Sequence, residues 1–496
     1  MTAKKQRTGR GKRAQAKPRT RKRPPMNVAK AEAADAVPIR HVVLLMLENR
    51  SFDQMLGLLK SDLPDLDGVP ANPPATNADP EEQIYPQQAG AAAKVDPDPG
   101  HEWANVQEQL EEDNGRFVKN YARLHPKTTR AQRQQIMSCF APDTLPALHA
   151  LARAFVVCDH WHASVPGPTW TNRLFAMSGT SLGFVEMPAG IAPSHFHTYE
   201  QPSVFRRLRE ANRSYRIYFG DFPLALLLAD QRSFSSAKNF SRMSRFFSDT
   251  KGGEASFPEF SFIEPSYLWP GTNDDHPPHD VNDGQRLVAD VYEALRANEE
   301  LWNSTLLVVT YDEHGGFFDH VVPPTEGVVP PDEHHQEGCT FDQLGVRVPA
   351  ILVSPWLDAM RCHERFDHTS LLRWLQKEWG LGDLGRRTAS ATSPLDVVPL
   401  RTAPRSDAPV KILPAAKAAK AKRLAKRAAE APPLNGNQLA ILALSDFLAS
   451  KSKQKPAAKG KAAAAALTTK VRGPADKSRL ARDRATQFLK ERGAKL

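Results

Sequence analysis

Residues 305–320, TLLVVTYDEHGGFFDH, combine an apolar run of strand length with a group of polar residues directly after it. Residues 305–310 are apolar and rich in β-branched side chains without polar alternation, which predicts a strand buried on both faces in a parallel sheet. Asp312, Glu313 and His314 follow at once, and the Gly-Gly pair after them lets the backbone approach a ligand closely. Ligands of open α/β sheets bind beyond the carboxyl ends of the strands. The alternative is that Asp312 and Glu313 are solvated residues of a turn.

A second predicted strand ends in the same way. Residues 39–47, IRHVVLLML, form another buried-strand candidate, and Glu48 and Asn49 follow it directly. Further strands are expected at residues 155–157, 215–219 and 348–354, and helices at residues 104–110, 201–210, 284–296 and after residue 367. We therefore expect an α/β protein with a mostly parallel central sheet flanked by helices.

Two threonines lie in a proline-rich turn. Residues 164–173, SVPGPTWTNR, place Thr169 and Thr171 at the predicted start of a helix. The free N–H groups of a helix N-terminus attract anions, so a hydroxyl there is well placed to attack a phosphoryl group. The alternative is that one of the threonines only caps the helix.

Three histidines lie in proline-containing loops. His101 is part of residues 98–103, DPGHEW, and His276 and His279 are part of residues 273–280, NDDHPPHD. Imidazoles near a phosphate stabilise its oxygens or protonate a leaving group. A His/Asp cluster in a solvated loop is also often no more than a loop.

The strand ends and the turn together supply oxygen ligands. Carboxylates, an amide and a hydroxyl come from Glu48, Asn49, Thr169, Asp312 and Glu313. Such ligands suit a hard divalent cation, although carboxylates also bind zinc. A cation there would lower the pKa of the Thr169 hydroxyl and neutralise a bound phosphate.

Charge divides the chain of 496 residues into three parts. Residues 1–30 contain 12 Lys/Arg and no Asp/Glu, and residues 411–496 contain 21 Lys/Arg against 5 Asp/Glu, so the remaining body is acidic. We predict a basic disordered arm over residues 1–37, a catalytic domain over residues 38–410, and a basic Ala/Lys-rich tail over residues 411–496 with a short helix near residues 438–448. The basic ends are candidates for contact with nucleic acid or anionic membrane; the alternative is that they are solvated spacers.

Neither a membrane span nor an export signal is visible in the sequence. No apolar run approaches the roughly 20 residues that a transmembrane helix needs, and the basic N-terminus lacks an apolar core segment. The four cysteines form no CxxC pair, so reduced thiols are expected. These features predict a cytoplasmic protein.

Five separated segments carry a resemblance to a known family. They are HVVLLMLENRSFDQMLG (41–57), VPGPTWTNRLFAMSGTS (165–181), NDDHPPHDV (273–281), LLVVTYDEHGGFFDHVVPP (306–324) and GVRVPAILVSPW (345–356). In this order they resemble the motifs of the bacterial phosphoesterase family that includes non-haemolytic phospholipase C and an acid phosphatase. The resemblance extends over roughly residues 38–400, and the basic ends lie outside it. Members of that family are often exported.

The resemblance implies an alkaline-phosphatase-like α/β fold and metal-dependent hydrolysis of phosphate esters, with phosphodiesters of the phospholipase C type preferred. It implies Thr169 as nucleophile and metal ligand. The other implied metal ligands are Glu48, Asn49, Asp312 and Glu313, the implied catalytic phosphate-pocket residues are His101 and His276, and the expected substrate-binding residues are Asn172, Arg173, His279 and His314. The cation is expected to be Ca²⁺, Mg²⁺, Mn²⁺ or Zn²⁺. Thr171 stands where the family usually has proline, which leaves a second hydroxyl near the first.

Three alternatives remain open. The first is an acid phosphatase acting on phosphomonoesters. The second is a non-catalytic protein on the same scaffold that binds polyanions, although a degenerate site usually lacks a ligand and here every candidate is present. The third is a sulfatase or phosphonate hydrolase, but no Cys or Ser nucleophile motif of that kind is visible. The expected partner is a phosphate-ester substrate, with phospholipids included, and no obligate protein partner is evident.

Overall fold

A mixed sheet of eight strands forms the centre of the computed structural model, which describes residues 38–70, 72–188, 196, 198–336, 338–413, 431–452 and 473–496. In spatial order the strands are β12 (Met360–Cys362), β6 (Val156–Cys158), β11 (Ala350–Val353), β10 (Thr305–Tyr311), β1 (His41–Leu47), β9 (Phe260–Glu264), β7 (Tyr215–Phe219) and β8 (Phe240–Arg242). All residues of β1 and β10 are buried. The predicted α/β class is confirmed.

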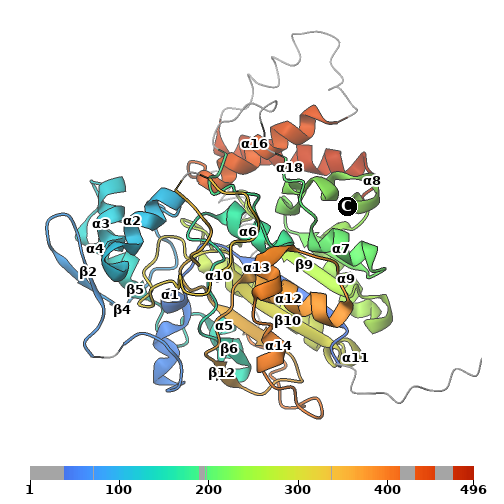
Figure 1. Ribbon diagram of the computed structural model, residues 1–496, viewed down its shortest axis with the longest axis horizontal. Helices are drawn as coiled ribbons and strands as arrows, with labels where there is room; N and C mark the ends of the chain where they lie inside the picture. Colours follow the sequence, from blue (N-terminus) through green and yellow to red (C-terminus); the bar gives the residue numbers. More distant parts are fainter. Residues whose placement is uncertain are drawn as a thin grey trace, which may run out of the picture. The chain divides into compact units, whose positions relative to one another are not determined.

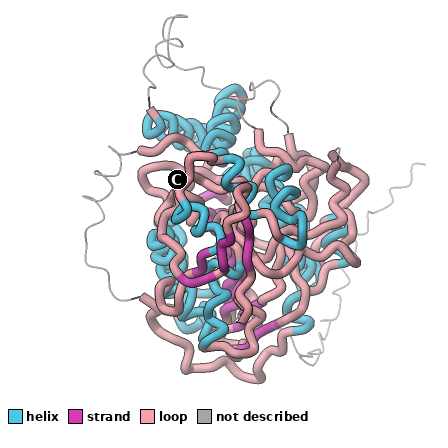
Figure 2. Tube along the Cα trace, turned by 90° about the vertical axis from the view of Figure 1, so that its left-hand side faces the viewer, coloured by secondary structure: helices cyan, strands magenta, loops and turns pink. Residues whose placement is uncertain are grey.

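The sheet is parallel except at one strand. β11 runs antiparallel to both of its neighbours, β10 and β6, whereas every other pair of neighbouring strands in the sheet is parallel. Figure 2 shows the strands in the interior, with helices on both sides. Burial on both faces explains why β1 and β10 are continuous apolar runs instead of alternating ones.

Helices and two small sheets surround the central sheet. The two small sheets are formed by β2 (Thr76–Ala78) with β3 (Ile84–Pro86) and by β4 (Gln88–Ala89) with β5 (Ser138–Cys139). The α-helices are α1 (Phe52–Leu56), α2 (Trp103–Asn114), α3 (Phe117–Leu124), α4 (Arg130–Gln134), α5 (Pro146–Ala154), α6 (Thr169–Ser178), α7 (Val204–Glu210), α8 (Phe234–Ala237), α9 (Met243–Asp249), α10 (Val281–Arg296), α11 (Glu299–Trp302), α12 (His368–Trp379), α13 (Gly385–Ser390), α14 (Pro394–Val397), α16 (Gly436–Ser450) and α18 (Pro474–Lys490).

Most predicted elements are present, and one central strand was missed. The helices expected near residues 104, 204, 284 and 368 correspond to α2, α7, α10 and α12. A capping box between Asp367 and Ser370 begins α12, as the sequence indicates. β9 was not predicted, although it pairs with both β1 and β7. Its sequence, FSFIE, is too short for periodicity to distinguish it from a loop.

Two helices follow the part of the chain expected to hold the catalytic domain. α16 and α18 pack against each other (Figure 1, red). The short helix expected near residues 438–448 falls within α16. The division of the chain at residue 410 remains a prediction, and the arm over residues 1–37 lies outside the described residues.

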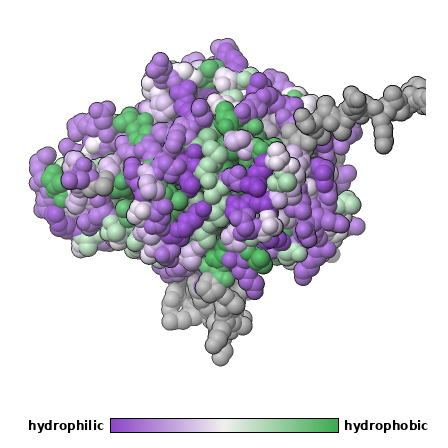
Figure 3. Space-filling view, turned by 90° about the horizontal axis from the view of Figure 1, so that it is seen from below, coloured by the Kyte–Doolittle hydropathy of each residue, from purple (hydrophilic) through white to green (hydrophobic). Residues whose placement is uncertain are grey.

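Polar side chains predominate on the face of the molecule drawn in Figure 3, where hydrophobic residues form only small groups. The four cysteines are buried and unpaired. Among the described residues, no helix is both long and apolar enough to cross a membrane.

Candidate active site

The carboxyl ends of β1 and β10 bring the predicted acidic residues together. The strands are parallel neighbours with Leu47 opposite Tyr311, so Glu48 and Asp312 leave the sheet side by side. The backbone N–H of Asn49 donates to Asp312 Oδ1 at 3.1 Å. Both carboxylates are fully buried. The sheet therefore joins two motifs that are far apart in the sequence.

The turns after the two strands approach each other too closely for an ordinary side chain. Gly315 has a φ of 66°, and a Cβ built on it would lie 2.1 Å from the carbonyl oxygen of Asn49. Asn49 itself has a φ of 61°, a left-handed conformation that asparagine tolerates better than most residues. The glycine of the DEHGG segment is required by this close approach.

Thr169 lies against the same strand ends. It is the first residue of α6, and its Oγ1 donates to Oδ1 of Asn49 at 3.4 Å. The Thr171 hydroxyl instead donates to the carbonyl oxygen of Phe184 at 3.3 Å. The N-cap of α6 is Pro168, and no side chain caps the helix, so neither threonine is its cap. Of the two hydroxyls, that of Thr169 contacts Asn49, the residue that follows Glu48 at the end of β1.

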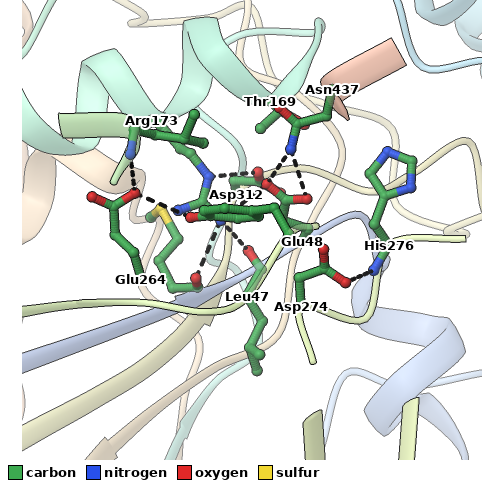
Figure 4. Close-up of polar contacts among 12 residues, drawn as sticks. Leu47, Glu48, Thr169, Arg173, Glu264, Asp274, His276, Asp312 and Asn437 are labelled. Atoms are coloured by element: carbon green, nitrogen blue, oxygen red, sulfur yellow. Dashed lines mark hydrogen bonds and ion pairs between the residues drawn. The ribbon is translucent and has the colours of Figure 1, made fainter. Parts of the chain in front are cut away.

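Arg173 lies between two of the buried carboxylates. Its Nε donates to Asp312 Oδ2 at 3.1 Å, and its Nη2 is 3.5 Å from Glu48 Oε1 (Figure 4). Burial raises the pKa of Glu48 well above its usual value and that of Asp312 to about 7, although Arg173 opposes both shifts. Arg173 is fully buried and ion-paired, so its contacts in this structure are with the protein.

Glu313 is directed toward a histidine. Its Oε1 lies 3.0 Å from Nδ1 of His101, and its Oε2 accepts the N–H of Gly315 at 2.7 Å. Burial alone would raise the pKa of Glu313, but His101 outweighs burial and lowers it to about 2. Burial disfavours the charged form of His101, yet Glu313 and Asp98 raise its pKa well above the usual value. The two carboxylates therefore favour the protonated form of His101.

Asp98, His101 and His276 form a compact group. Their nearest ligand atoms lie within 4.8 Å of one another, a spacing that can hold a metal ion. Burial lowers the pKa of His276, whose Nε2 makes no hydrogen bond within the protein. The sequence indicated both histidines but gave Asp98 no role. Its spacing of three residues from His101 was the only available signal.

The predicted metal ligands fit a hard cation by their chemistry. Glu48, Asp312 and Glu313 are fully buried carboxylates, and Asn49 and Thr169 add an amide and a hydroxyl oxygen. Among the described residues these carboxylates do not form a group as compact as that of Asp98, His101 and His276. Buried carboxylates need compensating charge, which a divalent cation supplies.

The other predicted substrate-binding residues are held by the protein. Asn172 accepts the N–H of Val165 and donates to the carbonyls of Val165, Gly167 and Pro168, so its amide organises the turn before α6. Substrate binding by Asn172 remains a prediction. His314 Nε2 lies 3.0 Å from Gln109 Oε1. Substrate binding by His314 and His279 remains a prediction.

A side chain from the C-terminal part of the chain also reaches the site. Asn437, at the start of α16, donates to both oxygens of Glu48 at 2.9 and 3.0 Å (Figure 4). Nothing in the Ala/Lys-rich composition around it indicated this contact. The expectation that residues 411–496 lie apart from the site therefore does not hold for Asn437.

Comparisons with known proteins agree with this arrangement. The model of the Phosphoesterase family matches residues 39–382. Non-specific phospholipase C3 of Arabidopsis thaliana is 36% identical over 413 residues, which cover 76% of this chain and 76% of that protein. Phospholipase C B of Mycobacterium tuberculosis is 30% identical over 395 residues, which cover 69% of this chain and 74% of that protein.

Among solved structures, a protein in the alkaline phosphatase superfamily from Vibrio parahaemolyticus matches 50% of this chain and 63% of its own, with 11% identity and a TM-score of 0.31. A likeness this weak adds nothing to what the sheet itself establishes. The family model, in contrast, covers more than half of the chain, and the motifs of β1, α6 and β10 meet at one edge of the sheet. This chain therefore belongs to the phosphoesterase family and is a phosphoric ester hydrolase.

Proposed function

We propose that the protein hydrolyses phosphodiesters of the phospholipase C type, with Thr169 as the nucleophile and a divalent cation at the ends of β1 and β10. The names of its relatives, non-specific phospholipase C3 and phospholipase C B, support the diester class. The observation that carries the proposal is the position of the Thr169 hydroxyl, which contacts Asn49 beside Glu48 and Asp312, whereas Thr171 is turned away.

The proposed ligands of the cation are Glu48, Asn49, Thr169, Asp312 and Glu313. When bound, the ion would lower the pKa of the threonine hydroxyl and offset the charge of the phosphate. Its identity stays open among Ca²⁺, Mg²⁺, Mn²⁺ and Zn²⁺. Asp98 is an additional candidate ligand, since it belongs to the compact group with His101 and His276.

The chain's own residues supply the nucleophile and the acid. Thr169 Oγ1 would lose its proton to water and form a bond to phosphorus while the bond from phosphorus to the oxygen of the leaving alcohol breaks. His101, protonated between Glu313 and Asp98, would donate a hydrogen bond to a phosphoryl oxygen or a proton to the leaving oxygen. Water would then hydrolyse the phosphothreonine and restore Thr169.

The test is hydrolysis of three substrate classes by the purified protein. A soluble phosphomonoester, a soluble phosphodiester and phosphatidylcholine vesicles are each assayed with chelator and after return of each of the four metals. We expect metal-dependent cleavage of both diesters, faster than that of the monoester. Faster cleavage of the monoester would favour an acid phosphatase, and activity that survives exhaustive chelation would contradict the role of the metal.

The basic ends are proposed to bring the enzyme to polyanionic surfaces. Attraction of this kind arises mainly from counterion release, so it falls steeply with salt. Deleting residues 1–36 should leave hydrolysis of the soluble diester nearly unchanged and reduce retention on heparin or anionic vesicles. If retention is unchanged after the deletion, residues 1–36 do not bind polyanions and are a solvated spacer.

A further inference from the structure

The first turn of α16 carries an amide whose orientation is fixed at both ends. Asn437 is buried, and its Oδ1 accepts the indole N–H of Trp170 at 3.0 Å while its Nδ2 donates to both oxygens of Glu48. An indole N–H can only donate and an ionised carboxylate can only accept. Rotating the amide by 180° would therefore oppose two donors at one end and two acceptors at the other. The protein holds the NH₂ group against Glu48.

Two neighbours of Asn437 contact the histidine loop. His279 Nδ1 lies 2.6 Å from Asp274 Oδ1, which places the proton on Nδ1 and leaves Nε2 as an acceptor. Gln438 Nε2 is 3.3 Å from that Nε2, and Asn435 Nδ2 is 3.1 Å from Nδ1 of His276. One helix turn therefore contacts both the end of β1 and the loop that carries the two histidines.

The helix is anchored to the rest of the protein. Its Phe447 stacks on Phe196 with ring centroids 5.1 Å apart, and the guanidinium of Arg232 lies 5.1 Å from the Phe447 ring. Asp446 is ion-paired with Arg484 of α18. These contacts hold the C-terminal end of α16, whereas Asn437 lies in its first turn. The position of the Asn437 amide is therefore supported by the packing of the helix as well as by its own hydrogen bonds.

We infer that α16, which lies outside the segment matched by the family model, belongs to the active site, and that Asn437 is a positioning residue that holds the carboxylate of Glu48. The inference rests on the proposed function in one respect, since Glu48 is a metal ligand there. Each carboxylate oxygen has two lone pairs, and Asn437 uses one on each, so Glu48 keeps acceptor capacity for a cation. Groups that orient metal ligands in this way typically change metal affinity or activity about 10- to 100-fold when removed.

The variant Asn437→Leu removes the amide but keeps the number and branching of the side-chain heavy atoms, and Asn437→Ser, which is smaller and retains one donor, serves if the leucine variant does not fold. Asn77→Leu is the matched control, because Asn77 in β2 is also buried with its amide bonded at both ends, to Asn114 and Val118. Full-length proteins are compared in three measurements: calorimetric titration with each metal alone, turnover of a soluble phosphodiester, and amide hydrogen exchange in chelator.

We expect Asn437→Leu to weaken metal binding about 10- to 100-fold, to lower kcat more than it changes KM, and to increase exchange at residues 47–50 without metal. Asn77→Leu should change only stability. Equal metal affinity and exchange in the Asn437 variants and the wild type would overturn the inference. A rise in the turnover of the Asn437 variants would also overturn the inference, because it would mean that α16 covers the active site and restricts access to it. A wild type without metal binding would contradict the proposed cofactor, while the exchange measurement would still decide the role of Asn437.

Discussion

Two buried clusters of charge in this protein differ in how completely their polar atoms are hydrogen-bonded. The active-site cluster consists of Glu48, Asp98, His101, Arg173, Asp274, His276, Asp312 and Glu313. The Arg347 cluster consists of Asp53, Asp319, His320 and Arg347. Each places an arginine between two carboxylates, and each contains three residues spaced to hold a metal ion or to pair with one another.

The Arg347 cluster is saturated. Arg347 Nη2 donates to Asp53 Oδ1 at 3.0 Å and its Nε to Asp319 Oδ1 at 2.8 Å. The other oxygen of Asp53 accepts from His320 and Gln87, and that of Asp319 accepts the N–H of Asp53. The protein thus supplies its own cations and donors here, so the cluster is a structural element although its spacing resembles that of a metal site.

The active-site cluster is not saturated. Asp274 Oδ2, His276 Nε2 and Arg173 Nη1 are buried and make no hydrogen bond within the protein. Unbonded buried polar atoms cost about 1–3 kcal/mol each, so folding alone does not favour them. The incomplete hydrogen bonding of the active-site cluster therefore indicates that this cluster is arranged for a ligand.

The largest effect is expected at the nucleophile. Thr169→Ala should reduce turnover of a soluble phosphodiester by about 10⁴-fold or more, because an essential nucleophile is lost, while the melting temperature changes little. Thr171→Ala is the control and should retain about a tenth of the activity or more, since its hydroxyl faces Phe184. Loss of activity in the opposite order would assign the nucleophile to Thr171.

Breaking the saturated cluster should destabilise the fold. Arg347→Met leaves Asp53 and Asp319 buried without their cation, which should lower the free energy of unfolding by about 3–5 kcal/mol in urea titrations. Arg153→Met removes an arginine whose ion pairs are solvent-accessible and should cost about 1 kcal/mol or less. Equal stability of the two variants would show that the Arg347 cluster is not a structural element.

A bound metal ion should increase the free energy of unfolding only by binding to the active-site cluster. At a concentration about 100 times Kd, a bound ion should add about 2.7 kcal/mol to the free energy of unfolding of the wild type. Glu48→Gln and Asp312→Asn should lose much of this increment, and excess metal should restore part of their activity. Asp319→Asn is destabilising but should keep the full increment. If Asp319→Asn abolished the increment instead, the ion would lie in the Arg347 cluster.

The smallest effect concerns pH. Burial disfavours the charged form of His320, but Asp53 and Asp67 outweigh burial and raise its pKa to about 10 in the folded protein. Since the folded state binds this proton more tightly than the unfolded state, its stabilisation is complete below pH 6.5 and is lost as pH rises through about 10. The free energy of unfolding of the wild type should therefore decrease more than that of His320→Gln over this range, in urea unfolding at each pH. Parallel profiles would contradict this.

The sequence by itself was enough to predict the two adjacent central strands β1 and β10, the fold class and the order of the chemical groups. Continuous apolar runs marked β1 and β10 because both faces of these strands are covered. The residues that follow each run, Glu48 and Asp312, were predicted to meet because parallel neighbours end at the same edge of a sheet. Such inferences succeed because periodicity and strand ends are local properties of the chain.

Only the tertiary structure decided which partners complete the site. Arg173, which was expected to bind substrate, is ion-paired with Glu48 and Asp312, and of the two threonine hydroxyls it is that of Thr169 that contacts Asn49. Asn437 is 389 positions from Glu48 in the sequence, in a segment for which the sequence predicted a basic tail with a short helix but no contact with the site. A hydrogen bond over this separation depends on how the helix packs, and neither periodicity nor composition carries that information.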